Sequence, residues 1–134
     1  MKICFFVTLF LMTVFTTYSQ NLIGYEAKDI KKYMSANNRD MNLERVSNKS
    51  FSYLKYSDRY DTQTMLFFLS PDSICTNIRI VCNNNVRSAK IRELDTAYQR
   101  KGENIWIDNH AGKNYLLKLV DDDWSFSIII EDEK

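Results

Sequence analysis

Two helical patterns, each followed by short runs with the periodicity of strands, set the range of folds open to this chain. The helical patterns cover about 27–37 and 86–101, and apolar residues recur in them every three or four positions. These residues are Ala27, Ile30 and Met34 in the first pattern, and Ile91, Leu94 and Tyr98 in the second. Each pattern therefore predicts a helix with one apolar face.

Seven runs of five to nine residues alternate as strands do, and they cover 41–45, 51–56, 64–69, 74–82, 104–109, 114–120 and 124–130. The run 64–69 is apolar on both faces, which is typical of a central strand. Turn residues separate the runs at 70–73, 109–112 and 121–123. Gly102, which follows two cationic residues, predicts the end of the second helix.

The predicted order is therefore helix, four strands, helix, three strands. We expect an α+β fold with a single antiparallel sheet of about seven strands and both helices on one face of it. A shift of 64 residues places Leu94 on Ile30 and Ile107 on Leu43, and it keeps the register through a helix and two strands. This match indicates an internal repeat.

A family resemblance accompanies this pattern. The segment Ile23-Gly24-Tyr25-Glu26-Ala27-Lys28-Asp29-Ile30, followed by hairpins, resembles the opening of repeats in the β-lactamase-inhibitor-protein-like family. The resemblance covers residues 22–70 and extends to 86–130. It implies a secreted or periplasmic αβββ module, often found in tandem, that binds other proteins. The run 74–82 is additional to a simple tandem, and the resemblance assigns no binding residue.

The first nineteen residues have the composition of an export signal. Lys2 precedes an apolar stretch over residues 3–15, and a polar segment that ends in the small residue Ser19 follows it. The stretch is shorter than the roughly 20 apolar residues of a membrane-spanning helix. We predict a cleaved signal peptide at 1–19 and one α+β domain at 20–134. The product is then periplasmic or extracellular without a membrane span, and the alternative is an uncleaved anchor.

Composition argues against several classes of function. The chain holds 18 basic and 17 acidic residues, so a nucleic-acid partner is not expected. Three Gly exclude a glycine-rich phosphate loop, and the single histidine, His110, lies in a predicted turn without a nucleophile motif. The run 121–123 is acidic but lacks the alternation and the glycine of a calcium loop. We therefore expect no enzyme activity, no cofactor and no metal site.

Two cysteines, Cys75 and Cys82, belong to the predicted strand 74–82. On one continuous strand their Cα atoms are about 23 Å apart. A disulfide needs about 4.4–6.8 Å. We expect buried free thiols, whereas a bridge requires either a hairpin in this segment or a second molecule.

The candidate site follows from the alternation of side chains along two runs. In 104–109, Trp106 lies on the face opposite Ile105 and Ile107. In 51–56, Tyr56 lies on the face opposite Phe51 and Tyr53. We expect the helices to cover the more aliphatic face, because its burial leaves no polar group to satisfy.

On this interpretation Tyr56 and Trp106 lie on the open face, and at least one of them is partly exposed. Arg79 and Lys118 join them there. Trp, Tyr and Arg are enriched in the residues that dominate binding between proteins. The alternative is the inverse orientation, in which Trp106 belongs to the core.

The function that fits these features is a small exported, non-enzymatic module that binds another protein, such as an inhibitor or an envelope immunity protein. Its small size, export, repeat pattern and lack of catalytic motifs favour this interpretation. Two alternatives are an accessory or structural component of the cell envelope, and an enzyme with an unrecognised site.

Overall fold

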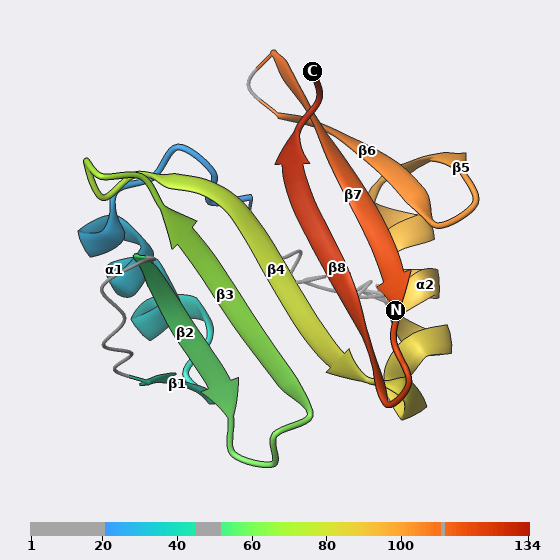
Figure 1. The fold of residues 1–134 in the computed structure, drawn as a ribbon, viewed down its shortest axis with the longest axis horizontal. Coiled ribbons are helices and arrows are strands. Elements are labelled where there is room, and N and C mark those ends of the chain that lie inside the picture. The colour runs from blue at the N-terminus through green and yellow to red at the C-terminus, as the bar shows by residue number, and fades with distance from the viewer. Residues whose placement is uncertain (1–20, 45–51, 111) are drawn as a thin grey trace, which may run out of the picture.

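A computed structural model describes residues 21–44, 52–110 and 112–134 (Figure 1). Its helices are α1 (Ala27–Asn37), the short 3-10 helix η1 (Asn84–Val86) and α2 (Arg87–Ala97). Its strands are β1 (Met41–Glu44), β2 (Tyr53–Asp58), β3 (Gln63–Leu69), β4 (Cys75–Asn83), β5 (Gln99–Gly102), β6 (Ile105–His110), β7 (Lys113–Asp121) and β8 (Ser125–Asp132). The predicted signal peptide at 1–19 and Phe51 lie outside the described residues.

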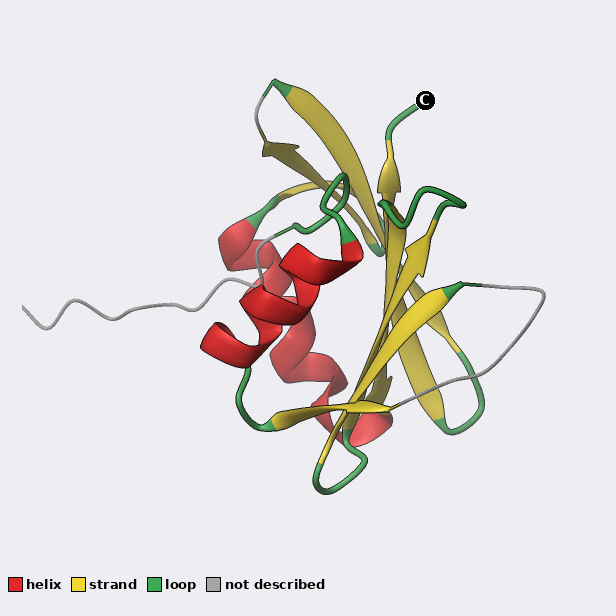
Figure 2. Cartoon of the chain, turned by 90° about the vertical axis from the view of Figure 1, so that its left-hand side faces the viewer, coloured by secondary structure: helices red, strands yellow, loops and turns green. Residues whose placement is uncertain are grey.

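One antiparallel sheet contains all eight of these strands, in the order β1-β2-β3-β4-β8-β7-β6-β5. Strands 1–4 and strands 5–8 each form a meander, and the two meanders meet where β4 pairs with β8. In Figure 1 these two central strands lie side by side although about 50 residues separate them in the sequence. Figure 2 shows both α-helices on the same side of the sheet. The predicted α+β class, single antiparallel sheet and two helices are confirmed.

The strand count differs from the prediction because the second helix is shorter than expected. It ends at Ala97, and Tyr98 already has the extended backbone angles φ −131° and ψ 162°. The next residues form β5, which pairs with β6 through Gln99 opposite Ile107. Gly102 therefore lies in a strand, beside a register shift, and does not end the helix as predicted.

This extra strand also changes how the two halves correspond. Each half of the described chain is a helix followed by four strands, where we predicted four strands and then three. The 64-residue shift matches Leu43 of β1 with Ile107 of β6. In the sheet, β1 and β5 occupy the two edges, and β4 and β8 occupy the centre. The register of the predicted repeat is therefore wrong.

Backbone hydrogen bonds of the segment just before α1 hold the start of this helix against the sheet. Gly24, with a φ of +89°, directs its backbone N–H to the carbonyl of Cys75 at 2.8 Å, and Cys75 N–H returns a bond of 2.9 Å to Tyr25. The N–H of Ala27 donates to the carbonyl of Ser73 at 2.9 Å. Leu22 is buried beside these bonds, so the start of α1 is held against β4.

The core lies between the two helices and the sheet face that they cover. The helices contribute Ile30 and Met34 from α1 and Leu94 from α2, as their apolar faces predict. Every strand from β2 to β4 and from β6 to β8 adds buried apolar residues. The largest of these are Trp106, Phe67 and Phe126, which expose no side-chain surface.

The orientation predicted for two aromatic residues is wrong. Trp106 is fully buried and Tyr56 is 5% exposed, and both face the helices. The ring of Tyr56 meets the ring of Phe67 edge to face, with centroids 6.0 Å apart. Ile105 and Ile107, which we expected under the helices, are half-buried on the other face.

The physical reason is that the polar atom of the indole finds a partner. The Trp106 Nε1–H donates to the carboxylate of Asp95, in the last turn of α2, at 2.8 Å. Burial of this ring therefore leaves no unsatisfied donor. The helices can then cover the face that carries the large rings of Trp106, Phe67 and Phe126.

The two tryptophans provide a matched test of this orientation. We expect Trp106→Ala to lower the free energy of unfolding by about 3–5 kcal/mol, because it leaves a cavity where the fully buried ring was. Trp124 is 88% exposed. Trp124→Ala should therefore change the free energy by no more than about 0.5 kcal/mol. Urea unfolding measures both, and equal effects would contradict the assigned orientation.

Candidate functional site

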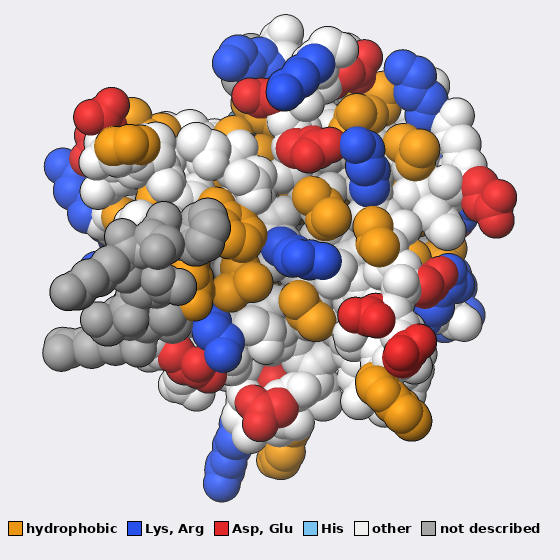
Figure 3. Space-filling view, in the orientation of Figure 1, with side chains coloured by type: hydrophobic (Ala, Val, Ile, Leu, Met, Phe, Trp, Pro, Cys, Tyr) orange, Lys and Arg blue, Asp and Glu red, His pale blue; other side chains and the backbone are white. Residues whose placement is uncertain are grey.

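The side of the sheet that the helices leave uncovered is the candidate site, and we call it the open face. It faces the reader in Figure 3, where apolar side chains are interspersed with basic and acidic ones. Directly opposed residues of antiparallel strands share a face. The register therefore defines one row across the open face: Lys55, Leu66, Arg79, Ile129, Lys118 and Ile105.

Eight apolar residues of intermediate exposure in the described chain lie on the open face. They are Tyr53, Leu66, Phe68, Val81, Ile105, Ile107, Leu116 and Ile129. Tyr53 and Phe68 partly cover each other, with ring centroids 5.9 Å apart. On a free chain this surface stays in contact with water, so covering it with a partner is favourable.

The three cations of the central row differ in their partners. Lys55 pairs with Glu44 at 3.0 Å, and Lys118 pairs with Glu131 at 2.6 Å. Arg79 is exposed and forms no ion pair within the described residues. Its cross-strand neighbours on the same face are Leu66 and Ile129. An exposed guanidinium without an ion pair in the described residues therefore lies between two apolar residues of the central row.

The structure divides the four predicted site residues into two pairs. Arg79 and Lys118 lie on the open face as predicted. Tyr56 and Trp106 belong to the core and are removed from the site. The apolar residues of the open face include Leu66, which could not be assigned to a face from the sequence because β3 is apolar on both faces.

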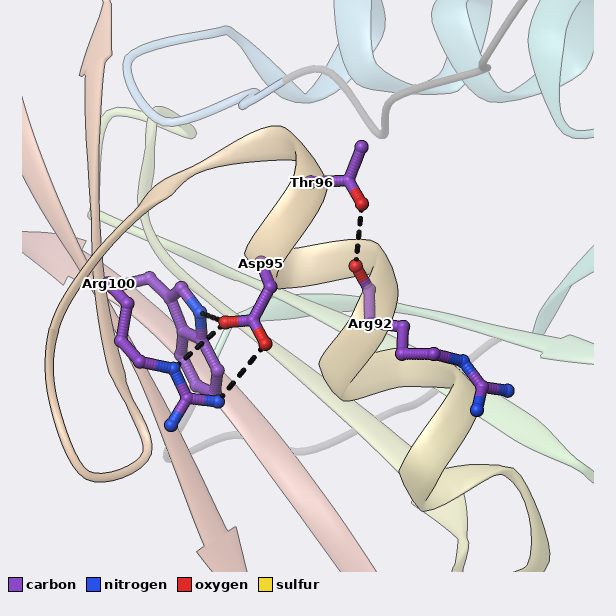
Figure 4. A network of polar contacts seen from close by, with 5 residues as sticks. Arg92, Asp95, Thr96 and Arg100 are labelled. Atoms are coloured by element: carbon purple, nitrogen blue, oxygen red, sulfur yellow. Dashed lines mark hydrogen bonds and ion pairs between the residues drawn. The ribbon is translucent and has the colours of Figure 1, made fainter.

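Trp106 belongs instead to a polar cluster on the helix side of the sheet (Figure 4). The carboxylate of Asp95 accepts hydrogen bonds from Arg100 at 2.8 and 3.3 Å and from the Trp106 indole at 2.8 Å. The guanidinium of Arg100 lies 4.9 Å from the centroid of the Trp106 ring. These contacts join the end of α2 to β5 and β6, so the cluster is structural.

The polar cluster lowers the pKa of the Asp95 carboxyl. The hydrogen bond from Arg100, and secondarily that from Trp106, holds the pKa of this carboxyl below its usual value. A carboxyl with a depressed folded pKa stabilises the fold above its unfolded pKa, near 3.9, and loses that contribution as the pH falls through the folded value.

We therefore expect Asp95→Asn to be less stable than the wild type at neutral pH, and the difference should shrink below about pH 3.9. Urea unfolding midpoints of both proteins at about pH 7 and about pH 2.5 measure this difference. Both proteins contain all the other carboxyl groups, so the pH dependence that those groups cause is removed when the two midpoints are subtracted. A difference that is the same at both pH values would mean that the charge of Asp95 does not matter.

The acidic run and the histidine form no metal site in the part of the chain that the structure describes, where no group of three or more His, Cys, Asp or Glu is close enough to hold an ion. Asp121 is engaged by Arg87 through bonds of 2.7 and 2.9 Å. His110 is exposed at the end of β6.

Both cysteines of the described chain are free and buried on β4, as predicted. Burial raises the pKa of the Cys75 thiol to about 12 and also raises the pKa of Cys82. A thiol reacts through its thiolate form, and a raised pKa makes that form scarce near neutral pH, so both thiols should react slowly in the folded protein.

We expect Cys75 and Cys82 to stay unmodified when the native protein meets a disulfide reagent such as DTNB at about pH 8, and to react once denaturant unfolds the chain. Peptide mapping by mass spectrometry identifies the labelled residues. Rapid labelling of either thiol in the native protein would contradict the burial of β4.

Comparisons with known proteins identify no family for this chain. No protein-family model matches it, and no solved structure matches it significantly. A human protein, DnaJ homolog subfamily C member 7, is 30% identical over 71 residues, which are 53% of this chain and 14% of that protein. The chain thus matches a small part of that protein's length.

The helices of the described residues are too short or too polar to span a membrane.

Proposed function

We propose that this protein is a small exported, non-enzymatic module that binds another protein through the open face of its sheet, as an inhibitor or an envelope immunity protein does. The observation that carries the proposal is the composition of that face. Arg79, an exposed cation without an ion pair in the described residues, lies between the half-buried Leu66 and Ile129 in the central row of that face.

This arrangement has the physical properties of a binding surface. An apolar centre supplies favourable desolvation, and an arginine there can form paired hydrogen bonds with a carboxylate or a carbonyl group. Arg79 lies on β4, whose hydrogen bonds to β3 and β8 hold its backbone in place. A surface on paired strands loses little conformational entropy when it binds.

The charges around this centre favour a protein over a polyanion. Lys55 and Lys118, the other cations of the row, are each neutralised by a glutamate. Nucleic acid binding depends on several free cations that follow a phosphate backbone. A single free guanidinium among apolar residues fits a partner with one acceptor group and an apolar surface.

The test uses two arginines that differ in position. Arg79→Glu should weaken binding of the partner by about 2 kcal/mol or more, because it puts a carboxylate at the centre of the contact. Arg92→Glu changes an exposed arginine on α2, away from the open face, and should have no effect. Both variants should keep the wild-type urea midpoint.

The partner is first captured by cross-linking from the envelope and secreted fractions of the native source, and its affinity for each purified variant is then measured by calorimetry. Equal binding by the wild type and Arg79→Glu would overturn the open face as the binding site. Loss of binding in Arg92→Glu alone would move the contact to the helix layer.

A further inference from the structure

The edge of the sheet at β1 differs from the edge at β5. Edge strands that avoid pairing with other chains carry bulges or cations. β5 has both, with a register shift between Arg100 and Gly102 and a further cation at Lys101. β1 pairs with β2 in regular register and contains no proline, lysine or arginine. Within residues 21–44, 52–110 and 112–134, no strand pairs with the outer edge of β1.

The hydrogen-bond pattern of the neighbouring strands identifies the free backbone groups of β1. Leu69 N–H donates to Ser52 at 2.9 Å, so the even-numbered residues of β2 direct their backbone groups to β3. The odd-numbered residues of β2 then bond to β1, where their partners are Asn42 and Glu44.

The remaining two residues of β1 direct their backbone groups away from the sheet. Met41 N–H is already bonded to the carbonyl of Asn38 at 3.0 Å. Leu43 therefore supplies the outward N–H of β1, together with its own outward carbonyl. An added strand would bond to this residue.

A hollow of about 490 Å³ adjoins this edge, between α1 and β1. Met41, Leu43 and Tyr56 supply its apolar lining. Leu43 lies opposite Tyr56 on the helix side of the sheet and is 41% exposed, which is high for a leucine on that side. The hollow can accept an apolar side chain from a strand added beside β1.

The charge at the rim of the hollow is positive. Lys31 from α1 and Arg39 from the turn before β1 both line it, and both are exposed. Neither forms an ion pair within the described residues, and none of the described residues lining the hollow is acidic. A carboxylate in an occupant would meet two cations that have no other partner.

We propose that the β1 edge binds an extended peptide segment of another protein as an added strand. An apolar side chain of the segment fills the hollow, and a carboxylate two residues away on the same face contacts Lys31 and Arg39. Two residues is the spacing because alternate side chains of a strand share a face. This site is separate from the open face and does not depend on the function proposed for it.

The experiment selects phage-displayed random nonapeptides on the immobilised protein and then measures the enriched peptides by fluorescence anisotropy. The expected sequences carry an apolar residue and an Asp or Glu two positions apart. Their Kd should rise at least tenfold in Leu43→Pro, which removes the outward N–H. Leu43→Ala keeps that N–H and should have the smaller effect. Near-ultraviolet circular dichroism confirms that each variant is folded.

A charge exchange tests the rim. The double variant Lys31→Glu with Arg39→Glu should lose at least tenfold in affinity for the acidic peptides and prefer versions in which Lys replaces their acidic residues. Lys32→Glu, next to Lys31 but outside the hollow, is the matched control and should leave the affinity unchanged. Arg79→Glu should also leave it unchanged, which separates this site from the open face.

Three results would overturn the proposal. They are selection of no peptide, selection of peptides without an acidic residue, and affinities that Leu43→Pro leaves intact. Sedimentation velocity of the wild type adds a fourth, since a dimer that Leu43→Pro abolishes would make a second copy of this chain the occupant of the edge.

Discussion

The hydrogen bond from the Trp106 indole to Asp95 allows the helices to cover the face of the sheet that carries this ring. Without an acceptor at the end of α2, burial of the indole would leave a donor unpaired at a cost of about 1–3 kcal/mol. With it, the aromatic face of β6 packs under α2, and the rest of the covered face follows because the register fixes the orientation of every neighbouring strand.

The composition of the open face follows from the packing of Trp106 against the helices. Because Trp106 and Tyr56 turn toward the helices, the residues that alternate with them turn outward. The open face therefore carries Ile105 and Ile107 in place of Trp106, and Tyr53 and Lys55 in place of Tyr56, and Arg79 lies in its central row. The same constraint places Leu43 on the helix side of β1, beside the hollow at the edge.

The sequence was sufficient for features that depend on local periodicity. The apolar face of α1, the turn at 70–73 and the strand character of β3 and β4 all follow from the spacing of residues. Two features depend on contacts between elements and were mispredicted. The predicted helix was too long: residues 99–102 form β5, because they pair with β6. The orientation of Trp106 depends on a hydrogen bond to Asp95, which lies eleven residues earlier in the sequence. Arg79 and Lys118 do lie opposite the helices, but on the other face from Trp106 and Tyr56, with which we had grouped them.

The pairing of β4 with β8 has a consequence for the assembly of the chain. Every other strand pair of the described sheet joins strands that follow one another in sequence, so each meander closes through short loops. β4 and β8 meet across about 50 residues, a contact with a higher cost in loop entropy. Until they meet, each half carries an apolar strand with one unpaired edge. The interval between the closure of the two halves and their union is therefore the stage at which this chain is most prone to pair with a neighbouring copy.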